Sequence, residues 1–122
     1  MRISISSQNE YAFTPDVFGN LELPDDEQFQ IICRRVDNTL YADRWSSFNF
    51  SGELVINPRE KIRSHIVKFV NAPMLSVDGK TEKELTIDEL LSGKYIELSD
   101  LVAQLTMFIS KSYSGDIEFK KK

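Results

Sequence analysis

The residues that could do chemistry in this chain are few, and no catalytic motif joins them. His65 is the only histidine and Cys33 is the only cysteine. No serine, cysteine or aspartate stands at a motif spacing from His65, so a Ser-His-Asp or Cys-His site has no support. We therefore expect His65 to be a boundary residue beside the apolar stripe of a helix, and Cys33 to be a small buried side chain.

The acidic residues favour solvated surfaces over acid–base or metal chemistry. Residues 25–27, Asp-Asp-Glu, follow Pro24 in a turn and are more simply a solvated loop. Asp88 and Glu89 fall in the first turn of an expected helix, where negative charge suits the helix dipole. Asp78-Gly79-Lys80 resembles part of a calcium loop but lacks the ligand spacing of an EF-hand. We therefore expect no metal, no cofactor and no enzyme activity.

Length and composition narrow the class of protein. A chain of 122 residues with 41% apolar and 28% charged residues fits one ordinary globular domain. The net charge of −4 argues against nucleic acid as a partner. No stretch approaches the length of a membrane span, and the N-terminus lacks the apolar core of a signal peptide. With a single cysteine, these features predict a cytoplasmic protein without an internal disulfide.

The charges are unevenly spread along the chain. Residues 1–60 hold five basic and ten acidic residues, whereas residues 61–122 hold ten and nine. This asymmetry could steer head-to-tail self-association, and solvated faces produce it just as often. Arg34 and Arg35 are consecutive in an expected strand and should point to opposite faces. Lys120–Lys122 form a short end that is more typical of a solubilising tail than of a nucleic-acid arm.

Signals for strands and turns dominate before Asn57. Strands are predicted for Arg2–Ser6, Phe29–Val36, Trp45–Phe50 and Glu53–Ile56. Ser51-Gly52 is a plausible hairpin turn between the last two. Residues 38–44 fit either a loop or a short helical turn.

From Asn57 onward the pattern has a helical period. Asn57-Pro58-Arg59-Glu60 predicts a capped helix start, and the apolar face of that helix continues to Val70 before Pro73. Asp78-Gly79 predicts a tight turn at the tip of a short hairpin or loop that begins at Leu75. Thr86-Ile-Asp-Glu89 is a capping box for a short helix that ends at Gly93. A last helix is predicted for Ser99–Ser112, and its apolar stripe consists of Leu101, Val102, Leu105, Phe108 and Ile109.

Together these signals predict an α+β fold in a single domain, residues 1–122. A small, mainly antiparallel N-terminal sheet should be followed by about three C-terminal helices. The β-rich part is expected over 1–56, the helical part over 57–114, and a flexible basic tail over 115–122.

The segment from Phe13 to Phe29 is the most unusual part of the chain. It places two prolines, a Gly-Asn pair, three phenylalanines and a cluster of acids in an irregular lead-in to a strand. Local folding does not need so many special residues, so the segment either covers its own core or docks on another molecule. Exposed aromatic and apolar side chains here would be the rigid anchors that protein interfaces favour. The candidate protein-interaction residues are Tyr11, Phe13, Pro15, Phe18, Asn20, Leu21, Leu23 and Pro24, and the final helix ranks second.

This segment also carries a resemblance to a known group of proteins. Phe13-Thr-Pro-Asp-Val-Phe-Gly-Asn-Leu-Glu-Leu-Pro-Asp-Asp-Glu-Gln resembles the opening of small proteins encoded among the virion structural genes of tailed bacteriophages and prophages. The C-terminal half resembles phage tail-assembly chaperones, in its helix from Pro58 to Val70, its Asp78-Gly79 loop and its last two helices. Residues 41–56 have no counterpart in that pattern. The basic end also differs from the acidic ending expected of such chaperones.

The resemblance implies a non-enzymatic role in virion assembly through protein–protein contact, as in a tail-assembly chaperone. The partners would be tape-measure, tail or connector subunits in the host cytoplasm, and a place in the finished virion stays open. A second interpretation is a phage-encoded acidic inhibitor that uses Asp25, Asp26 and Glu27 against a basic cleft of a host protein. Neither interpretation involves nucleic acid or a membrane.

Overall fold

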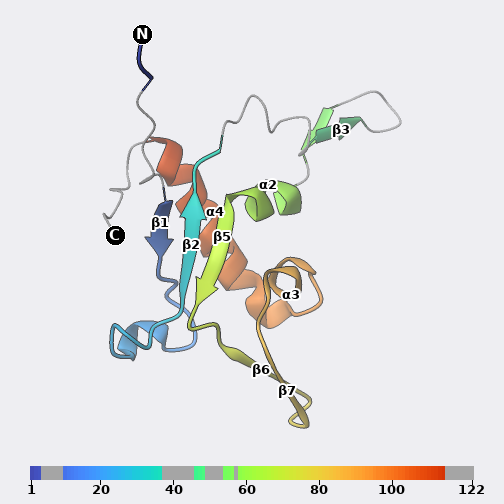
Figure 1. Ribbon diagram of the computed structural model, residues 1–122. Coiled ribbons are helices and arrows are strands. Elements are labelled where there is room, and N and C mark those ends of the chain that lie inside the picture. The colour runs from blue at the N-terminus through green and yellow to red at the C-terminus, as the bar shows by residue number, and fades with distance from the viewer. Residues whose placement is uncertain (4–9, 37–45, 49–53, 57, 115–122) are drawn as a thin grey trace.

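The computed structural model describes residues 1–3, 10–36, 46–48, 54–56 and 58–114. It shows the predicted α+β class, with antiparallel sheets and helices and a long final helix, α4 (Ser99–Ser114) (Figure 1). The order of elements differs from a sheet followed by helices, because strands also form within residues 58–114. The predictions for residues 4–6, 38–44, 51–52, Asn57 and 115–122 lie outside the described residues.

The central sheet has three antiparallel strands. β2 (Gln30–Arg34) lies between β1 (Glu10–Phe13) and β5 (Ile66–Val70), and it confirms the strand predicted for residues 29–36. The register places Tyr11 opposite Cys33 and Phe13 opposite Ile31. Because alternate residues of a strand share a face, these four buried side chains line one side of the sheet.

The prediction of a helix from Asn57 to Val70 is wrong in its second half. α2 (Pro58–His65) is helical, but residues 66–70 form β5, which pairs with β2 through Ile31 opposite Phe69. The apolar spacing fits one face of a helix, whereas Ile66-Val-Lys-Phe-Val is rich in β-branched and aromatic residues. Pairing with a strand far earlier in the chain therefore overrides the local period.

Two hairpins complete the strands. The first consists of β3 (Ser46–Phe48) and β4 (Leu54–Ile56), as the sequence predicts. The second consists of β6 (Met74–Val77) and β7 (Thr81–Glu84) and extends below the sheet in Figure 1. Asp78 and Gly79 at its tip have φ angles of 56° and 68°, which confirms the tight turn. A turn with two left-handed residues matches the twist of the strands that it joins.

Local sequence signals determine where the last helices begin and end. Thr86 Oγ1 accepts a hydrogen bond from the Glu89 backbone N–H at 3.2 Å and caps α3 (Ile87–Leu91). The Glu89 carboxylate, expected to return a bond to Thr86, instead accepts a hydrogen bond at Oε1 from Lys83 Nζ at 2.9 Å. Gly93, with φ 75°, follows α3, and the short helix η2 (Ile96–Leu98) leads into α4.

The core forms where α4 crosses the sheet. Its ring contacts place Phe108 5.6 Å from Tyr11 and 4.6 Å from Phe13, centroid to centroid. Leu101, Leu105 and Ile109 are at most 3% exposed, as the predicted stripe requires. Burying such a stripe contributes about 1.5–3 kcal/mol for each large apolar side chain.

Arg34, the last residue of β2, and Arg35, which follows it, reach different helices. Arg34 Nε donates to the Ser64 carbonyl at 3.2 Å, near the C-terminus of α2. Arg35 donates from Nε and Nη2 to the Ser112 carbonyl of α4 at 3.1 and 2.9 Å. Positive charge at the C-terminal end of a helix interacts favourably with the helix dipole.

His65 is not the boundary residue that the sequence predicts, because its side chain is completely buried. Its Nδ1 lies 2.6 Å from the Lys61 carbonyl, which fixes the proton on Nδ1, since a carbonyl can only accept. Burial lowers the pKa of His65 below its usual 6.5, and the nearby charges of Lys61 and Arg34 lower it further, against the hydrogen bond to the Lys61 carbonyl.

This environment predicts a loss of stability in mild acid. The unfolded chain binds a proton near pH 6.5, whereas folded His65 binds it only at lower pH. Its contribution is therefore complete above pH 6.5 and declines as pH falls below that value, by at most about 1.4 kcal/mol per pH unit. Urea unfolding between pH 7.5 and 5 should show a shallower decline for His65→Gln than for the wild type. Equal slopes would contradict the prediction.

Candidate functional site

The eight residues singled out between Tyr11 and Pro24 divide into a buried and an exposed group. The buried ones are Tyr11, Phe13, Pro15 and Asn20. The exposed ones are Phe18, Leu21, Leu23 and Pro24. The segment therefore covers its own core and also presents apolar side chains outward.

Asn20 holds the 14–29 loop (residues 14–29, which include the short helix η1, Asn20–Glu22) from the inside. Its Nδ2 donates to the carbonyls of Pro15 at 2.9 Å and Phe29 at 3.0 Å. Its Oδ1 accepts from the Phe29 backbone N–H at 2.7 Å. Both amide hydrogens and the amide oxygen are thus bonded, in a residue that is only 6% exposed. Its contact with Phe29 reproduces the two-bond pairing of a strand partner.

Two further carboxamides tie the 14–29 loop to the rest of the fold. Asn71, at the corner between β5 and β6, donates from Nδ2 to the carbonyls of Asp26 at 2.8 Å and Gln28 at 3.1 Å. Gln104 of α4 donates to the Asp16 carbonyl at 3.0 Å and accepts from the Asp16 N–H at 2.9 Å. A connection of this length usually moves as a loop, and these bonds instead fix it at its start and its end.

The backbone turns sharply outward at Phe18. Phe18 and Gly19 both have left-handed φ angles, of 50° and 74°. Glycine adopts this conformation freely, but a bulky residue such as Phe18 does so at a cost of about 1–2 kcal/mol. The result is a phenylalanine that is 74% exposed at the top of the turn. Such outliers persist only where the surrounding structure determines them, as the bonds of Asn20 do here.

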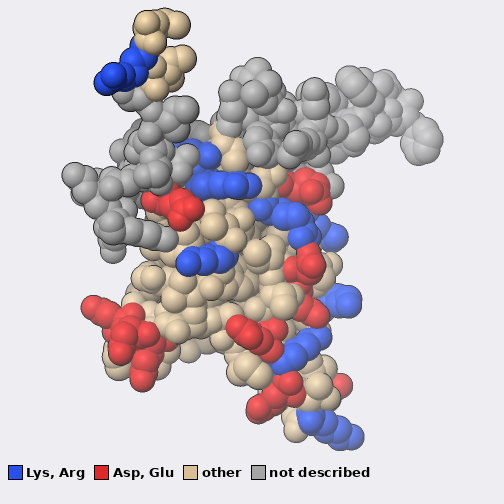
Figure 2. Space-filling view, in the orientation of Figure 1, with Lys and Arg blue, Asp and Glu red and all other residues tan. Residues whose placement is uncertain are grey.

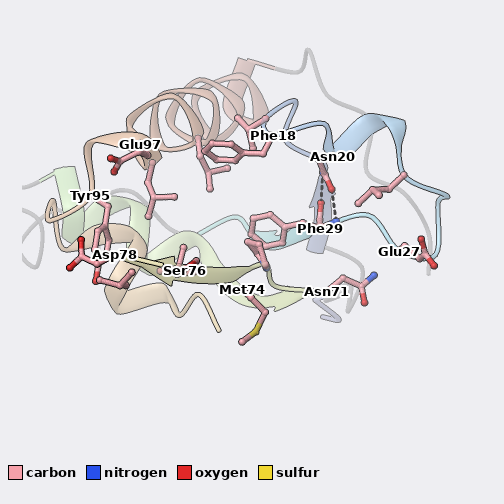
Figure 3. A pocket seen from close by; sticks show the side chains of 17 residues that line it. Phe18, Asn20, Glu27, Phe29, Asn71, Met74, Ser76, Asp78, Tyr95 and Glu97 are labelled. Carbon is pink, nitrogen blue, oxygen red and sulfur yellow. Dashed lines mark hydrogen bonds between the residues drawn. The ribbon is translucent and has the colours of Figure 1, made fainter. Parts of the chain in front are cut away.

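Beside Phe18 lies a groove of about 620 Å³ with three walls (Figure 3). The 14–29 loop forms the first wall, β6 and the residues before it form the second, and the segment leading into α4 forms the third. Phe29 lies at its floor and stacks edge-on against Phe69 of β5, with 5.3 Å between ring centroids. The main apolar lining residues are Val17, Phe18, Leu23, Phe29, Met74, Leu75, Val77, Tyr95, Leu98 and Leu101.

All the charged side chains that line this groove are acidic. Glu27 lies toward one end, and Asp78 and Glu97 lie toward the other (Figure 3). Exposed Glu22, Asp25 and Asp26 extend the negative surface beyond Glu27, and Figure 2 shows these acids gathered over the loop that carries η1. The potential along the groove is therefore negative, which favours a partner with positive charge.

The sequence pattern does not assign two of the three walls to the site. Met74 is 59% exposed and belongs to β6, which the sequence indicates only as one side of a short hairpin or loop around Asp78-Gly79. The alternation Leu75-Ser76-Val77 is the signal that could have placed this strand at a surface. Tyr95 and Leu98 lie between two predicted helices and carry no signal of their own, because only the fold brings them to the 14–29 loop.

The final helix, ranked second from the sequence, offers less surface than expected. The apolar stripe of α4 packs into the core of the protein, and Leu105 is completely buried. Met107 points away from that core and is 61% exposed. α4 contributes Leu101 to the groove but no apolar face of its own.

An ion pair lies near Tyr95, outside the lining of the groove. Lys83 Nζ pairs with Glu89 and lies 5.7 Å from the centre of the Tyr95 ring. The hydrogen bond to Glu89 raises the pKa of Lys83, and the same bond lowers the pKa of Glu89, so both stay ionised at neutral pH. A partly exposed ion pair of this kind adds little stability.

The buried thiol and the metal-binding residue types take no part in the groove. Cys33 lies in the core on the face of β2 that also carries Ile31, where burial raises the pKa of its thiol to about 12. Among the described residues, no three His, Cys, Asp or Glu side chains gather as metal ligands. Within the same residues, no helix is long and apolar enough to cross a membrane.

A second hollow lies on the other side of Tyr95, between α2, α3 and the start of α4. It carries charges of both signs, from Arg59, Lys94 and Glu97. Because neither sign dominates, it shows no preference for a charged partner comparable to that of the acidic groove.

Comparisons of the chain with protein-family models, with curated proteins and with solved structures found no match.

The bonds of Asn20 predict a large effect of a small change. Asn20→Asp keeps the shape but replaces both N–H donors by an acceptor, so the carbonyls of Pro15 and Phe29 would face a carboxylate. We expect a loss of about 2–4 kcal/mol in the free energy of unfolding, because buried groups would be left unpaired. Gln104→Ala, which cuts an exposed tie to the same loop, should cost about 1 kcal/mol or less. Urea unfolding measures both, and equal losses would contradict the prediction.

Proposed function

We propose that the protein acts by non-covalent contact with another protein and binds an apolar segment with basic flanks in this groove. One observation carries the proposal: exposed Phe18 and Met74 stand beside an apolar groove whose charged lining residues are all acidic. Isolated exposed apolar residues are common on protein surfaces. Their concentration around a groove is a feature of binding sites.

The rigidity of the 14–29 loop supports this use. Binding costs free energy wherever it must order flexible side chains and loops. Here the loop is fixed by Asn20, Asn71 and Gln104 before any partner arrives. An aromatic side chain that is exposed and held in place resembles the anchors that dominate measured binding energies.

The shape of the groove favours a helix or a short extended segment. Amphipathic helices commonly place their apolar side chains into such grooves, and the groove's volume lies in the range of ordinary ligand sites. Glu27 at one end and Asp78 with Glu97 at the other would contact basic residues before and after the apolar stretch. This charge pattern would raise the rate of association and reject acidic segments.

For the partner, we propose a subunit of a phage tail. The resemblance of residues 13–28 and of the C-terminal half to virion-assembly proteins supports tape-measure, tail or connector subunits as the source of the segment. The protein would cover that segment in the host cytoplasm until the subunits polymerise, without catalysing a reaction. This role requires reversible contact of the kind that a rigid groove provides.

A second candidate function rests on the acids alone. Exposed Glu22, Asp25, Asp26 and Glu27 would suit an inhibitor that occupies a basic cleft of a host protein. Contact through these exposed charges should weaken strongly as salt rises. Contact through Phe18 and Met74 should tolerate salt, because burial of apolar surface does not depend on screening.

Phe18 provides the test of the groove. Phe18→Gly removes the exposed ring and relieves the left-handed strain, so the free energy of unfolding should stay equal or rise by up to about 1 kcal/mol. Binding to the partner should weaken at least about tenfold, as expected for an aromatic anchor. The measurement is recovery of tail subunits, identified by mass spectrometry, from phage-infected or prophage-induced cells, followed by titration with the purified subunit.

Met107→Ser is the matched control for this experiment. Met107 is an exposed apolar residue of α4 outside the groove, so its replacement should leave binding unchanged. Equal binding by wild type and Phe18→Gly would overturn the proposed site. Recovery of one host enzyme without virion proteins, lost at high salt, would favour the inhibitor.

A further inference from the structure

The last eight residues have the chemistry that the groove would accept. They read Gly-Asp-Ile-Glu-Phe-Lys-Lys-Lys and follow the end of α4 at Ser114. In an extended chain, Ile117 and Phe119 project to one face, and Asp116 and Glu118 project to the other. The segment therefore offers two neighbouring apolar side chains followed directly by three positive charges.

The groove offers the complementary arrangement. Its lining is mainly apolar, and the 14–29 loop beside it contains five acidic residues and no basic one. Three of these acids, Asp25, Asp26 and Glu27, are consecutive and exposed. Phe18 and Leu23 lie in the wall next to them. The lysine end of the segment is best matched by residues 25–27, where three exposed acids are consecutive, rather than by Asp78 and Glu97 at the other end of the groove.

The groove is beyond the reach of the apolar pair of the same chain. The groove meets α4 at Leu101, which is thirteen residues before Ser114 and so about 20 Å from it along the helix. Gln104 of α4, which holds the 14–29 loop at Asp16, is ten residues before Ser114 and so about 15 Å from it. Even a fully extended chain carries Ile117 only about 10 Å from Ser114, short of both Leu101 and Gln104, whereas Phe119 extends to about 18 Å. An occupant that places Ile117 and Phe119 together in the groove must therefore come from another molecule.

We propose that the groove binds residues 115–122 of a second copy of this chain. Ile117 and Phe119 enter beside Phe18 and Leu23, and Lys120–Lys122 face Asp25, Asp26 and Glu27. This inference rests on the proposed function, because it assigns a second occupant to the same groove. The contact joins two different surfaces, so it leaves one free groove and one free tail at the ends and continues head to tail.

The size of the contact makes it weak and reversible. Eight residues bury less surface than the interfaces of stable complexes, so association should appear only at high protein concentration. A phage-tail subunit with a longer apolar segment would displace residues 115–122 of the second copy from the groove. Self-association would thus keep Phe18 and Leu23 covered while no partner is present, and it would compete with partner binding.

Two variants of the full chain test this inference through charge. The tail variant carries Lys120→Glu, Lys121→Glu and Lys122→Glu. The groove variant carries Asp25→Lys, Asp26→Lys and Glu27→Lys, at exposed positions where Asp26 and Glu27 bond to the rest of the fold through their backbone. Sedimentation velocity across a wide concentration range should show association of the wild type and at least tenfold weaker association of each variant.

A mixture of the two variants provides the decisive measurement. Each variant alone brings like charges together, whereas in the mixture every tail meets a groove of opposite charge. The mixture should therefore associate although its components do not, which misfolding of either variant cannot produce. A control with Lys68→Glu, Lys94→Glu and Lys111→Glu has the same net charge as the tail variant and should associate like the wild type.

The outcomes separate this inference from the proposed function. A wild type that stays monomeric throughout, or a tail variant that associates as well as the wild type, overturns the inference. If Phe18→Gly still reduces binding to the tail subunit in that case, the proposed function stands. If Phe18→Gly affects neither self-association nor subunit binding, both fail.

Discussion

The candidate site depends on one buried carboxamide. Asn20 takes the place of a strand partner for Phe29 and closes the 14–29 loop onto the start of β2. The amide fits in one orientation only, because its oxygen faces an N–H and its nitrogen faces two carbonyls. This single set of bonds buries Phe29 beneath the groove and turns Phe18 outward above it. In the local sequence, Gly19 allows the turn and the neighbouring Asn20 supplies the hydrogen bonds that fix it.

The elements that the sequence predicts are those whose causes lie within a few residues. Thr86 caps α3 from three residues away, and Asp78-Gly79 turns its hairpin without help from the rest of the fold. β5 is different, because residues 66–70 fit a helix and a strand equally well. Its conformation is decided by the free edge of β2, which local patterns do not contain. The same dependence hides β1, a strand of four residues that exists through its pairing with β2.

The candidate site, like the fold, was predictable from the sequence only where its causes are local. The composition of residues 11–24 marks a special segment, but it does not separate the buried residues from the exposed ones. Tyr11 and Phe13 are buried because Phe108 of α4 covers them, and Phe18 is exposed because nothing in the described fold lies over it. The walls formed by β6 and Tyr95 come from distant parts of the chain. The prediction that His65 lies at a boundary was wrong for a similar reason, because its burial follows from residues 66–70 forming a strand instead of continuing the helix.

The conformation of Phe18 argues that this surface is selected for something other than stability. Folding alone favours glycine at a left-handed position, and it favours a polar residue at an exposed one. Phenylalanine opposes both preferences, and the fold tolerates it because Asn20 fixes the turn on either side. A protein tolerates such a cost where the side chain is used. The proposed contact with a basic, apolar segment of protein would use Phe18 together with the neighbouring apolar walls and the acidic lining.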